Sequence, residues 1–181
     1  MAKRVFFSFH YERDNWRSSI VRNSDVTKED SVFIDAVAWE EIKKKTKKEI
    51  EKWILDQMKG TSTTLVLIGK ETTERDWVRF EIIESRKKGN AIIGIRIHNI
   101  KDKDGNKDLE GSLDFGVIDV DANGNELSFE NLYPIYDWIN DNGYENLEKW
   151  INKHEEASQK RNKHTVDISP THSQKKWNEN E

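Results

Sequence analysis

Apolar runs alternate with amphipathic stretches through the first half of the chain. Short apolar runs typical of buried strands cover residues 4–9, 31–34, 63–68 and 91–97. The stretches between them repeat apolar residues at helical spacing, over residues 11–22, 41–59 and 74–88. This alternation predicts an α/β fold of the flavodoxin-like class, a parallel sheet with helices on both faces.

The pattern changes after Asn99. A polar loop over residues 101–108 is followed by two apolar runs on either side of Asn123-Gly124. Asn-Gly between apolar runs is typical of a tight β-hairpin. We therefore expect residues 100–133 to form an insertion that carries a small hairpin.

The last part of the chain predicts one more helix and a tail. Pro134 is expected to begin the helix, Gly143 to interrupt it, and apolar residues up to Ile151 to continue it. From residue 154 to 181 apolar residues are few and without period, which is typical of a disordered terminal segment. The pattern thus predicts one domain over residues 1–153 and a disordered tail over residues 154–181.

Composition narrows the classes of function. The formal net charge of −4 argues against a protein that mainly holds nucleic acid. The chain has no cysteine, which excludes disulfides, thiol catalysis and cysteine-bound metals. No apolar stretch approaches the roughly 20 residues of a membrane span, and the N-terminal apolar run is too short for a secretory signal. We expect a cytoplasmic protein that binds neither nucleic acid nor membrane.

Residues 75–83 carry the candidate catalytic group. They follow the apolar run 63–68, and ligands of α/β sheets bind at the rim where a strand ends and the next helix begins. Trp77 and Glu81 are four residues apart, so they share one face of the helix. A carboxylate on that rim could act in catalysis. The spacing alone favours the alternative, an exposed glutamate on a solvated helix face.

Several motifs occur in an order that resembles TIR domains. They are Val5-Phe-Phe-Ser8, Phe33-Ile-Asp35 with Trp39, and Leu65–Ile68 followed by Thr72-Thr73, Trp77 and Glu81. Over most of residues 1–153 the chain is more narrowly similar to the TIR proteins of the Thoeris anti-phage defence system. The further stretches that carry this likeness are Met1–Tyr11, Trp77–Ile82, Lys88–Asn90, Ile93–Ile95, Lys101–Asn106 and Tyr136–Ile139.

The resemblance implies a TIR-like fold and an enzyme that takes NAD as its substrate, with no further cofactor and no metal. Such enzymes cleave the bond between nicotinamide and ribose and join the ADP-ribose into a cyclic isomer, which activates an effector protein. The same resemblance gives Glu81 the central catalytic role. A noncatalytic TIR-like module that signals by self-association stays open as the alternative, because this architecture hosts both kinds of function.

Five further residues are candidates for the substrate pocket, each with a structural alternative. Phe7 could stack on a base or the nicotinamide ring, or belong to the core. Ser8 could hydrogen-bond ribose or phosphate, and His10 could donate to a phosphate or be structural. Asp35 could bind a ribose or cap the following turn, and Trp39 could form a pocket wall or pack in the core.

Overall fold

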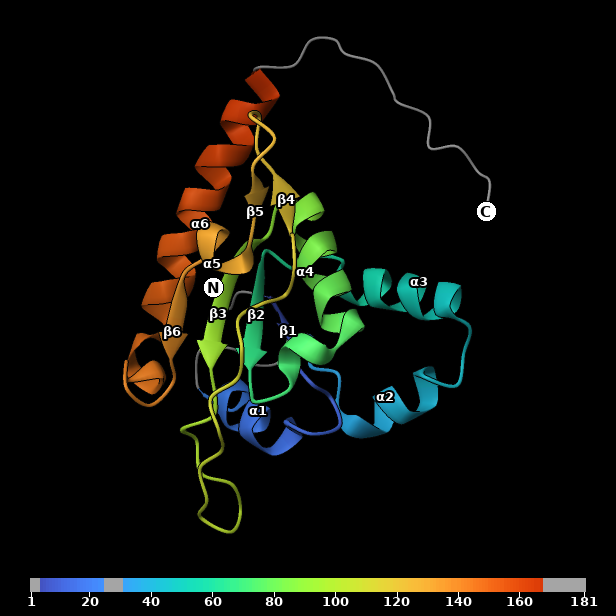
Figure 1. Cartoon of the computed structure of the whole chain (residues 1–181), viewed down its shortest axis with the longest axis vertical. Helices are drawn as coiled ribbons and strands as arrows, with labels where there is room; N and C mark the ends of the chain where they lie inside the picture. The colour runs from blue at the N-terminus through green and yellow to red at the C-terminus, as the bar shows by residue number, and fades with distance from the viewer. Residues whose placement is uncertain (1–3, 25–30, 168–181) are drawn as a thin grey trace.

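The computed structural model describes residues 4–24 and 31–167, and a four-stranded parallel sheet lies at its centre (Figure 1). The strand order is β1-β2-β3-β6, and each neighbouring pair is parallel. The strands are β1 (Val5–Ser8), β2 (Thr63–Ile68), β3 (Ala91–Arg96) and β6 (Ile135–Asp137). The predicted α/β class with a parallel sheet is therefore confirmed.

Helices flank this sheet and a small hairpin extends from it (Figure 1). The helices are α1 (Asn15–Arg22), α2 (Ala36–Ile42), α3 (Lys47–Met58), the 3-10 turn η2 (Thr72–Glu74), α4 (Asp76–Lys88), α5 (Phe129–Leu132) and α6 (Gly143–Asp167). The hairpin strands are β4 (Asp119–Val120) and β5 (Glu126–Leu127), which pair antiparallel. This confirms the hairpin that Asn123-Gly124 predicts.

Alternating side chains of the central strands divide the core between the two faces of the sheet. Leu65 and Leu67 of β2 pack in one cluster, together with Trp150 of α6. Val66 of β2 packs in a second cluster, together with Ile82 of α4. Since successive side chains of a strand point to opposite faces, α6 and α4 cover different sides of the sheet, as Figure 1 shows.

The predicted helix over residues 41–59 is wrong at its start, because two helices share that range. Helix α2 ends at Ile42 and α3 begins at Lys47. Thr46 separates them, since its side chain accepts a hydrogen bond from the Glu49 backbone while the Glu49 carboxylate accepts one from the Thr46 backbone. This reciprocal capping starts a new helix in the middle of an apparently continuous pattern.

The predicted strand over residues 31–34 is reduced to a single bridge beside β1. Val32 pairs with Phe6, through hydrogen bonds of 2.7 Å to the Val5 carbonyl and 3.0 Å from the Phe7 amide. The segment leaves the sheet at Asp35, where α2 is capped. It lies beside β1 as expected, but too few of its residues pair to form a strand.

The helix predicted to begin at Pro134 is also wrong. Residues 135–137 form β6, which pairs with β3 from Gly94 to Arg96, and the Pro134 carbonyl accepts from the Gly94 amide at 2.9 Å. Proline has no amide hydrogen to donate, which suits the entry of an edge strand. The free edge of β3 thus decides the structure here, and the last helix begins only at Gly143.

Helix α6 runs past the predicted start of the tail to Asp167. The Glu155 carboxylate accepts hydrogen bonds from the Ser62 and Thr63 hydroxyls at 2.7 and 2.6 Å, and Ser158 donates to the Gly89 carbonyl at 2.9 Å. Polar contacts therefore hold a segment that has few apolar residues, and the expectation of disorder is wrong for residues 154–167. Residues 168–181 of the predicted tail lie outside the described residues.

The insertion over residues 100–133 is held in place by arginines that lie outside it. They donate mostly to backbone carbonyls: Arg17 to Ile100 and Asn106, Arg79 to Phe115 and Val117, and Arg96 to Gly111. Two more bind carboxylates of the insertion, Arg13 that of Asp108 and Arg86 that of Asp119. A segment with little regular structure is thereby fixed along the sheet.

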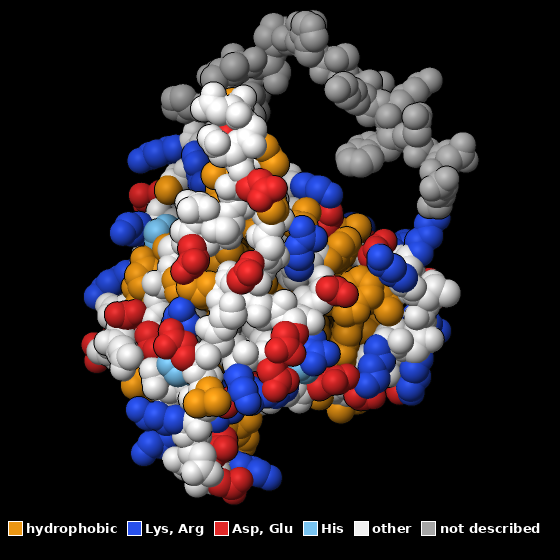
Figure 2. Space-filling view, in the orientation of Figure 1, with side chains coloured by type: hydrophobic (Ala, Val, Ile, Leu, Met, Phe, Trp, Pro, Cys, Tyr) orange, Lys and Arg blue, Asp and Glu red, His pale blue; other side chains and the backbone are white. Residues whose placement is uncertain are grey.

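The surface is mixed in charge on the face that Figure 2 shows, where acidic and basic side chains are interspersed. Within residues 4–24 and 31–167, no helix combines the length and apolar character that a membrane crossing requires.

Candidate active site

Glu81 lies in the second turn of α4, and its side chain is completely buried. The Ser8 hydroxyl, at the end of β1, donates to Oε2 at 2.5 Å. The Tyr11 hydroxyl donates to Oε1. Both carboxyl oxygens are thus held by hydroxyls from the carboxyl end of β1. The exposed helix glutamate that the spacing alone favours is not what the structure shows.

The protonation of Glu81 is controlled by its burial. Burial raises the pKa of Glu81 to about 8, although the hydrogen bonds from Ser8 and Tyr11 act to lower it. Burial, together with the neighbouring Glu81, holds the pKa of the Tyr11 phenol well above its ordinary value. At neutral pH this closed site therefore holds mainly an uncharged carboxyl group and an uncharged phenol.

Aromatic rings cover this carboxyl group. The Tyr11 ring lies 4.8 Å from Phe9 and 5.0 Å from Trp39, measured between ring centroids. Trp39, from α2, lies 6.3 Å from Trp77 of α4 in an edge-to-face arrangement. Figure 1 shows α2 beyond the carboxyl ends of the strands. The site therefore lies at the rim where α/β sheets bind ligands, beneath a layer of aromatic side chains.

The predicted pocket residues divide into two groups. Ser8 bonds directly to Glu81, and Trp39 packs on Tyr11 above it. Phe7 is fully buried and packs edge-on against Phe33 at 5.7 Å, which fits its core alternative.

His10 and Asp35 make their contacts elsewhere. The His10 Nδ1 accepts from the Arg13 amide at 3.3 Å, and burial, then the charge of Arg75, lowers its pKa. Asp35 is exposed and accepts from the Ala38 amide at 2.8 Å, which is the capping role. The structure thus brings Ser8 and Trp39 to Glu81, but not these two residues.

Tyr11 is a site residue that sequence reasoning missed. The periodicity predicts a helix over residues 11–22 that includes Tyr11, whereas α1 begins only at Asn15. Tyr11 therefore belongs to the turn that leaves β1, three residues after Ser8. A polar aromatic residue so close to the end of a buried strand was the signal that could have indicated a place on the ligand-binding rim.

A second buried carboxyl group lies beside the same edge of the sheet. Asp14 is fully buried, its Oδ1 accepts from Arg13 at 3.2 Å, and its Oδ2 has no hydrogen-bond partner among the described residues. Burial raises the pKa of Asp14 to about 6. Gly69, at the end of β2, lies so close that a Cβ there would be 2.3 Å from Oδ2.

We expect the free energy of unfolding to fall as pH rises from about 4 to about 8. An acid whose pKa is raised in the folded state binds more protons when folded than when unfolded, so stability is lost between the two pKa values. For Glu81 this window runs from 4.5 to about 8, and for Asp14 from 3.8 to about 6. Urea unfolding across this pH range should show that the free energy of unfolding decreases by a few kcal/mol, on the order expected for such pKa shifts. Glu81→Gln should remove most of the slope above pH 6, and an unchanged slope would contradict this assignment.

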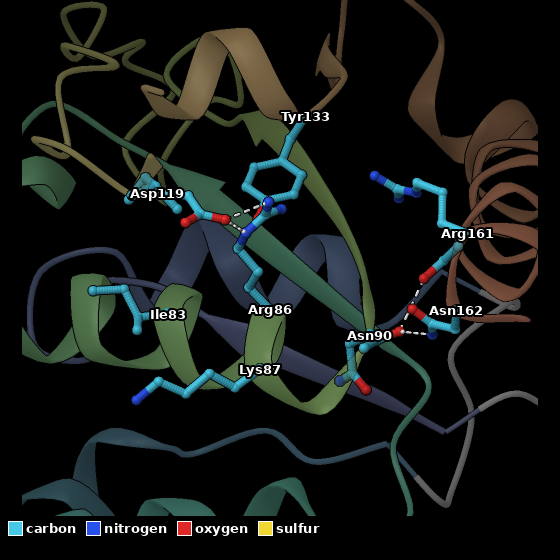
Figure 3. Close-up of a pocket in the computed structure, with 11 residues that line it drawn as sticks. Ile83, Arg86, Lys87, Asn90, Asp119, Tyr133, Arg161 and Asn162 are labelled. Atoms are coloured by element: carbon cyan, nitrogen blue, oxygen red, sulfur yellow. Dashed lines mark hydrogen bonds and ion pairs between the residues drawn. The ribbon is translucent and has the colours of Figure 1, made fainter. Parts of the chain in front are cut away.

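The pocket in Figure 3 lies at the other end of α4, away from Glu81. It has a volume of about 460 Å³, and several of its polar groups already bond to one another. Arg86 points to Asp119 and Tyr133, at 2.6 and 3.2 Å, and Asn162 donates to the Gly89 carbonyl at 3.1 Å. We therefore place the candidate active site at Glu81 and not in this pocket.

Comparison of the amino-acid sequence with known proteins gives a family match and a similar protein. Residues 6–102 match the family described as "Thoeris protein ThsB, TIR-like domain". The chain is also similar to a protein of Bacillus cereus (strain MSX-D12) named "Putative cyclic ADP-D-ribose synthase ThsB1". The two are 36% identical over an alignment of 193 residues, which covers 84% of this chain and 100% of the relative.

Proposed function

Because the chain belongs to the ThsB family of TIR-like Thoeris proteins, we propose that it is an anti-phage defence enzyme that converts NAD into a cyclic isomer of ADP-ribose. The observation that carries the proposal is the Glu81 carboxyl group, buried at the carboxyl end of the sheet and held by two hydroxyls. The name of the relative, a cyclic ADP-D-ribose synthase, supports the class of product.

The chemistry needs little more than a placed carboxylate and a dry pocket. Nicotinamide leaves NAD as a neutral molecule, so no general acid is required. Cleavage builds positive charge on the ribose, as in glycoside hydrolysis, and an ionised Glu81 facing that ribose would stabilise the charge. Glu81 must lose its proton for this role, which requires a more polar surrounding than the closed site.

The aromatic cover favours cyclisation over hydrolysis. After nicotinamide leaves, a cyclic product forms when a nucleophile of the same molecule attacks the ribose carbon and gives up its proton. Water competes for that carbon. Trp39 packs on Tyr11 at the site and against Trp77, and it would exclude water once the substrate is bound. The product would then reach an effector protein by diffusion, without contact between the two proteins.

The noncatalytic alternative has an observation in its favour as well. A buried carboxyl group with both oxygens bonded is also what a purely structural residue would show. An interaction module that signals by self-association would need Glu81 only for its fold. The two functions differ in whether an NAD-derived product forms.

We expect that product in infected cells. Cells that carry the chain are infected with phage, small molecules are extracted, and mass spectrometry searches for a species one water lighter than ADP-ribose. Cells without the chain serve as the control, and ADP-ribose itself reports plain hydrolysis. Intact phage resistance with no such species and no loss of NAD would reject the enzyme and favour the interaction module.

A further inference from the structure

The Glu81 carboxyl group has no oxygen available to a substrate in this structure. Ser8 occupies Oε2, Tyr11 occupies Oε1, and the exposed fraction of the side chain is 0%. A carboxylate that stabilises a charged ribose must face that ribose directly. At least one of the two hydroxyl donors must therefore move before the proposed reaction can begin.

The two donors differ in how firmly they are held. Ser8 is the last residue of β1, and its backbone pairs with Val66 of the neighbouring strand β2. Tyr11 lies beyond the strand, in the turn before α1, and its ring packs on Phe9 and on Trp39. Rotation of the small Ser8 hydroxyl would leave its Cβ in place and free no room for a ribose, whereas rotation of the Tyr11 ring would free both Oε1 of Glu81 and the space beside it. Tyr11 is thus the donor that can leave.

The cover above Tyr11 is a short element. Trp39 is the one buried residue of α2, a helix of seven residues whose outer side exposes 75% of Val37. The ring of Trp39 lies between Tyr11 and Trp77. A displacement of this single ring would uncover Tyr11 without disturbing the strands. Tyr11 and Trp39 therefore form one movable unit over a fixed Ser8.

We propose that Tyr11 is a gate, whose hydroxyl occupies the place at Glu81 that a ribose hydroxyl of the substrate takes, and which turns away together with Trp39 to admit that substrate. The inference rests on the proposed function, since it assigns a substrate hydroxyl to the vacated oxygen. It makes the phenol an internal competitor of the substrate. The structure accordingly shows the resting state of the site.

Electrostatics couples opening of the gate to activation of the carboxyl group. The groups that face Glu81 are Tyr11, a phenol of raised pKa, and the non-titrating Ser8 hydroxyl. Burial is the main cause that raises the pKa of Glu81. Opening of the gate removes the Tyr11 hydrogen bond, a loss that acts to raise the pKa, and relieves the burial, which is the larger cause, so the pKa falls and the carboxyl group ionises. The closed enzyme thus keeps its central group both covered and uncharged.

The gate is tested first without any enzymatic assay, by the access of a reagent to Glu81. A water-soluble carbodiimide with a glycine ester couples to accessible carboxyl groups, and peptide mass spectrometry gives the rate at Glu81. Tyr11→Phe keeps the ring and removes the competing hydroxyl. Loss of a hydrogen bond to a carboxyl group should raise the open population, and so the labelling rate, roughly tenfold. A rate equal to that of the wild type would overturn the gate.

The matched control is Tyr133→Phe, which removes a phenol that bonds to Arg86 far from Glu81. It should leave the labelling of Glu81 unchanged. Trp39→Leu is the second variant, since it removes the ring packed on Tyr11 and leaves both hydrogen bonds to Glu81 in place. It should also raise labelling, and it keeps the test decisive if Tyr11→Phe does not fold. If folded Trp39→Leu were labelled at Glu81 no faster than the wild type, Tyr11 and Trp39 would not move together.

Turnover then separates the gate from the proposed function. If the phenol competes with substrate, Tyr11→Phe should lower the KM for NAD roughly tenfold and change kcat little. A purely structural tyrosine predicts the reverse, a lower stability and a lower kcat. Faster labelling with no turnover of NAD by any variant would support the gate and reject the proposed function. Turnover by the wild type with unchanged labelling would retain the function and reject the gate.

Discussion

Glu81→Gln is expected to lower formation of the NAD-derived product by roughly 100- to 1000-fold and to leave the fold intact. Glutamine has the shape of the protonated carboxyl group that the closed site holds, so its amide oxygen can accept from the Tyr11 hydroxyl and its amide nitrogen can donate to the Ser8 hydroxyl oxygen. It can never become negative, and so it cannot stabilise a charged ribose. The loss should therefore appear in kcat, while the unfolding midpoint at neutral pH should not fall below that of the wild type.

Glu84→Gln is the matched control for that experiment. Glu84 lies in the same helix, three residues on, and pairs with Lys87 at 2.6 Å. Product is measured by mass spectrometry, in extracts of infected cells and with the purified protein and NAD. Glu84→Gln should retain its activity. Wild-type product formation by Glu81→Gln would remove the carboxylate from the mechanism, and Glu81 would then be a structural residue of the core.

Gly111→Ala is expected to lower the free energy of unfolding by roughly 3 kcal/mol. A Cβ at this buried position would lie 1.9 Å from the Gly69 carbonyl oxygen and 3.1 Å from the Lys70 Cα. Both neighbours are backbone atoms, so no flexible side chain can move to make room. Relief requires either the insertion or the end of β2 to shift. A shift of Gly69 would also disturb Asp14, which is packed against it.

Urea unfolding compares Gly111→Ala with Leu109→Ala, two residues earlier. Leu109 is 66% exposed, so its truncation should change the unfolding free energy by no more than about 0.5 kcal/mol. A lower midpoint for Gly111→Ala with an unchanged slope would indicate a loss of stability in the folded state. Equal midpoints for the two variants would show that the insertion does not rest closely on β2.

The strands that could be predicted are those buried on both faces. β2 and β3 have continuous apolar sequences that fit a central parallel strand, and the structure confirms both predictions. β6 could not be predicted in this way. It has three half-buried residues, and its conformation comes from the free edge of β3, a partner some 40 residues earlier in the chain. Local pattern carries no information about such a partner.

The residues of the candidate site also divide into those that local sequence predicts and those that depend on contacts between distant parts of the chain. Ser8 and Glu81 could be placed on one rim, because each follows or ends a recognisable strand. The Tyr11 hydroxyl reaches Glu81 across 70 residues of sequence, and no spacing rule connects them. Asp35 could serve either of two roles on sequence grounds, and the Ala38 amide that it caps decides the role the structure shows.

The way the insertion is fastened has a consequence for how its sequence can change. Arg17, Arg79 and Arg96 hold it by backbone carbonyl oxygens, which every amino acid provides. These contacts depend on the path of the loop, whereas the ion pairs of Asp108 and Asp119 and the burial of Phe115 depend on particular side chains. The exposed positions that make none of these contacts are free to vary, so this edge can acquire new recognition surfaces while the central sheet stays as it is.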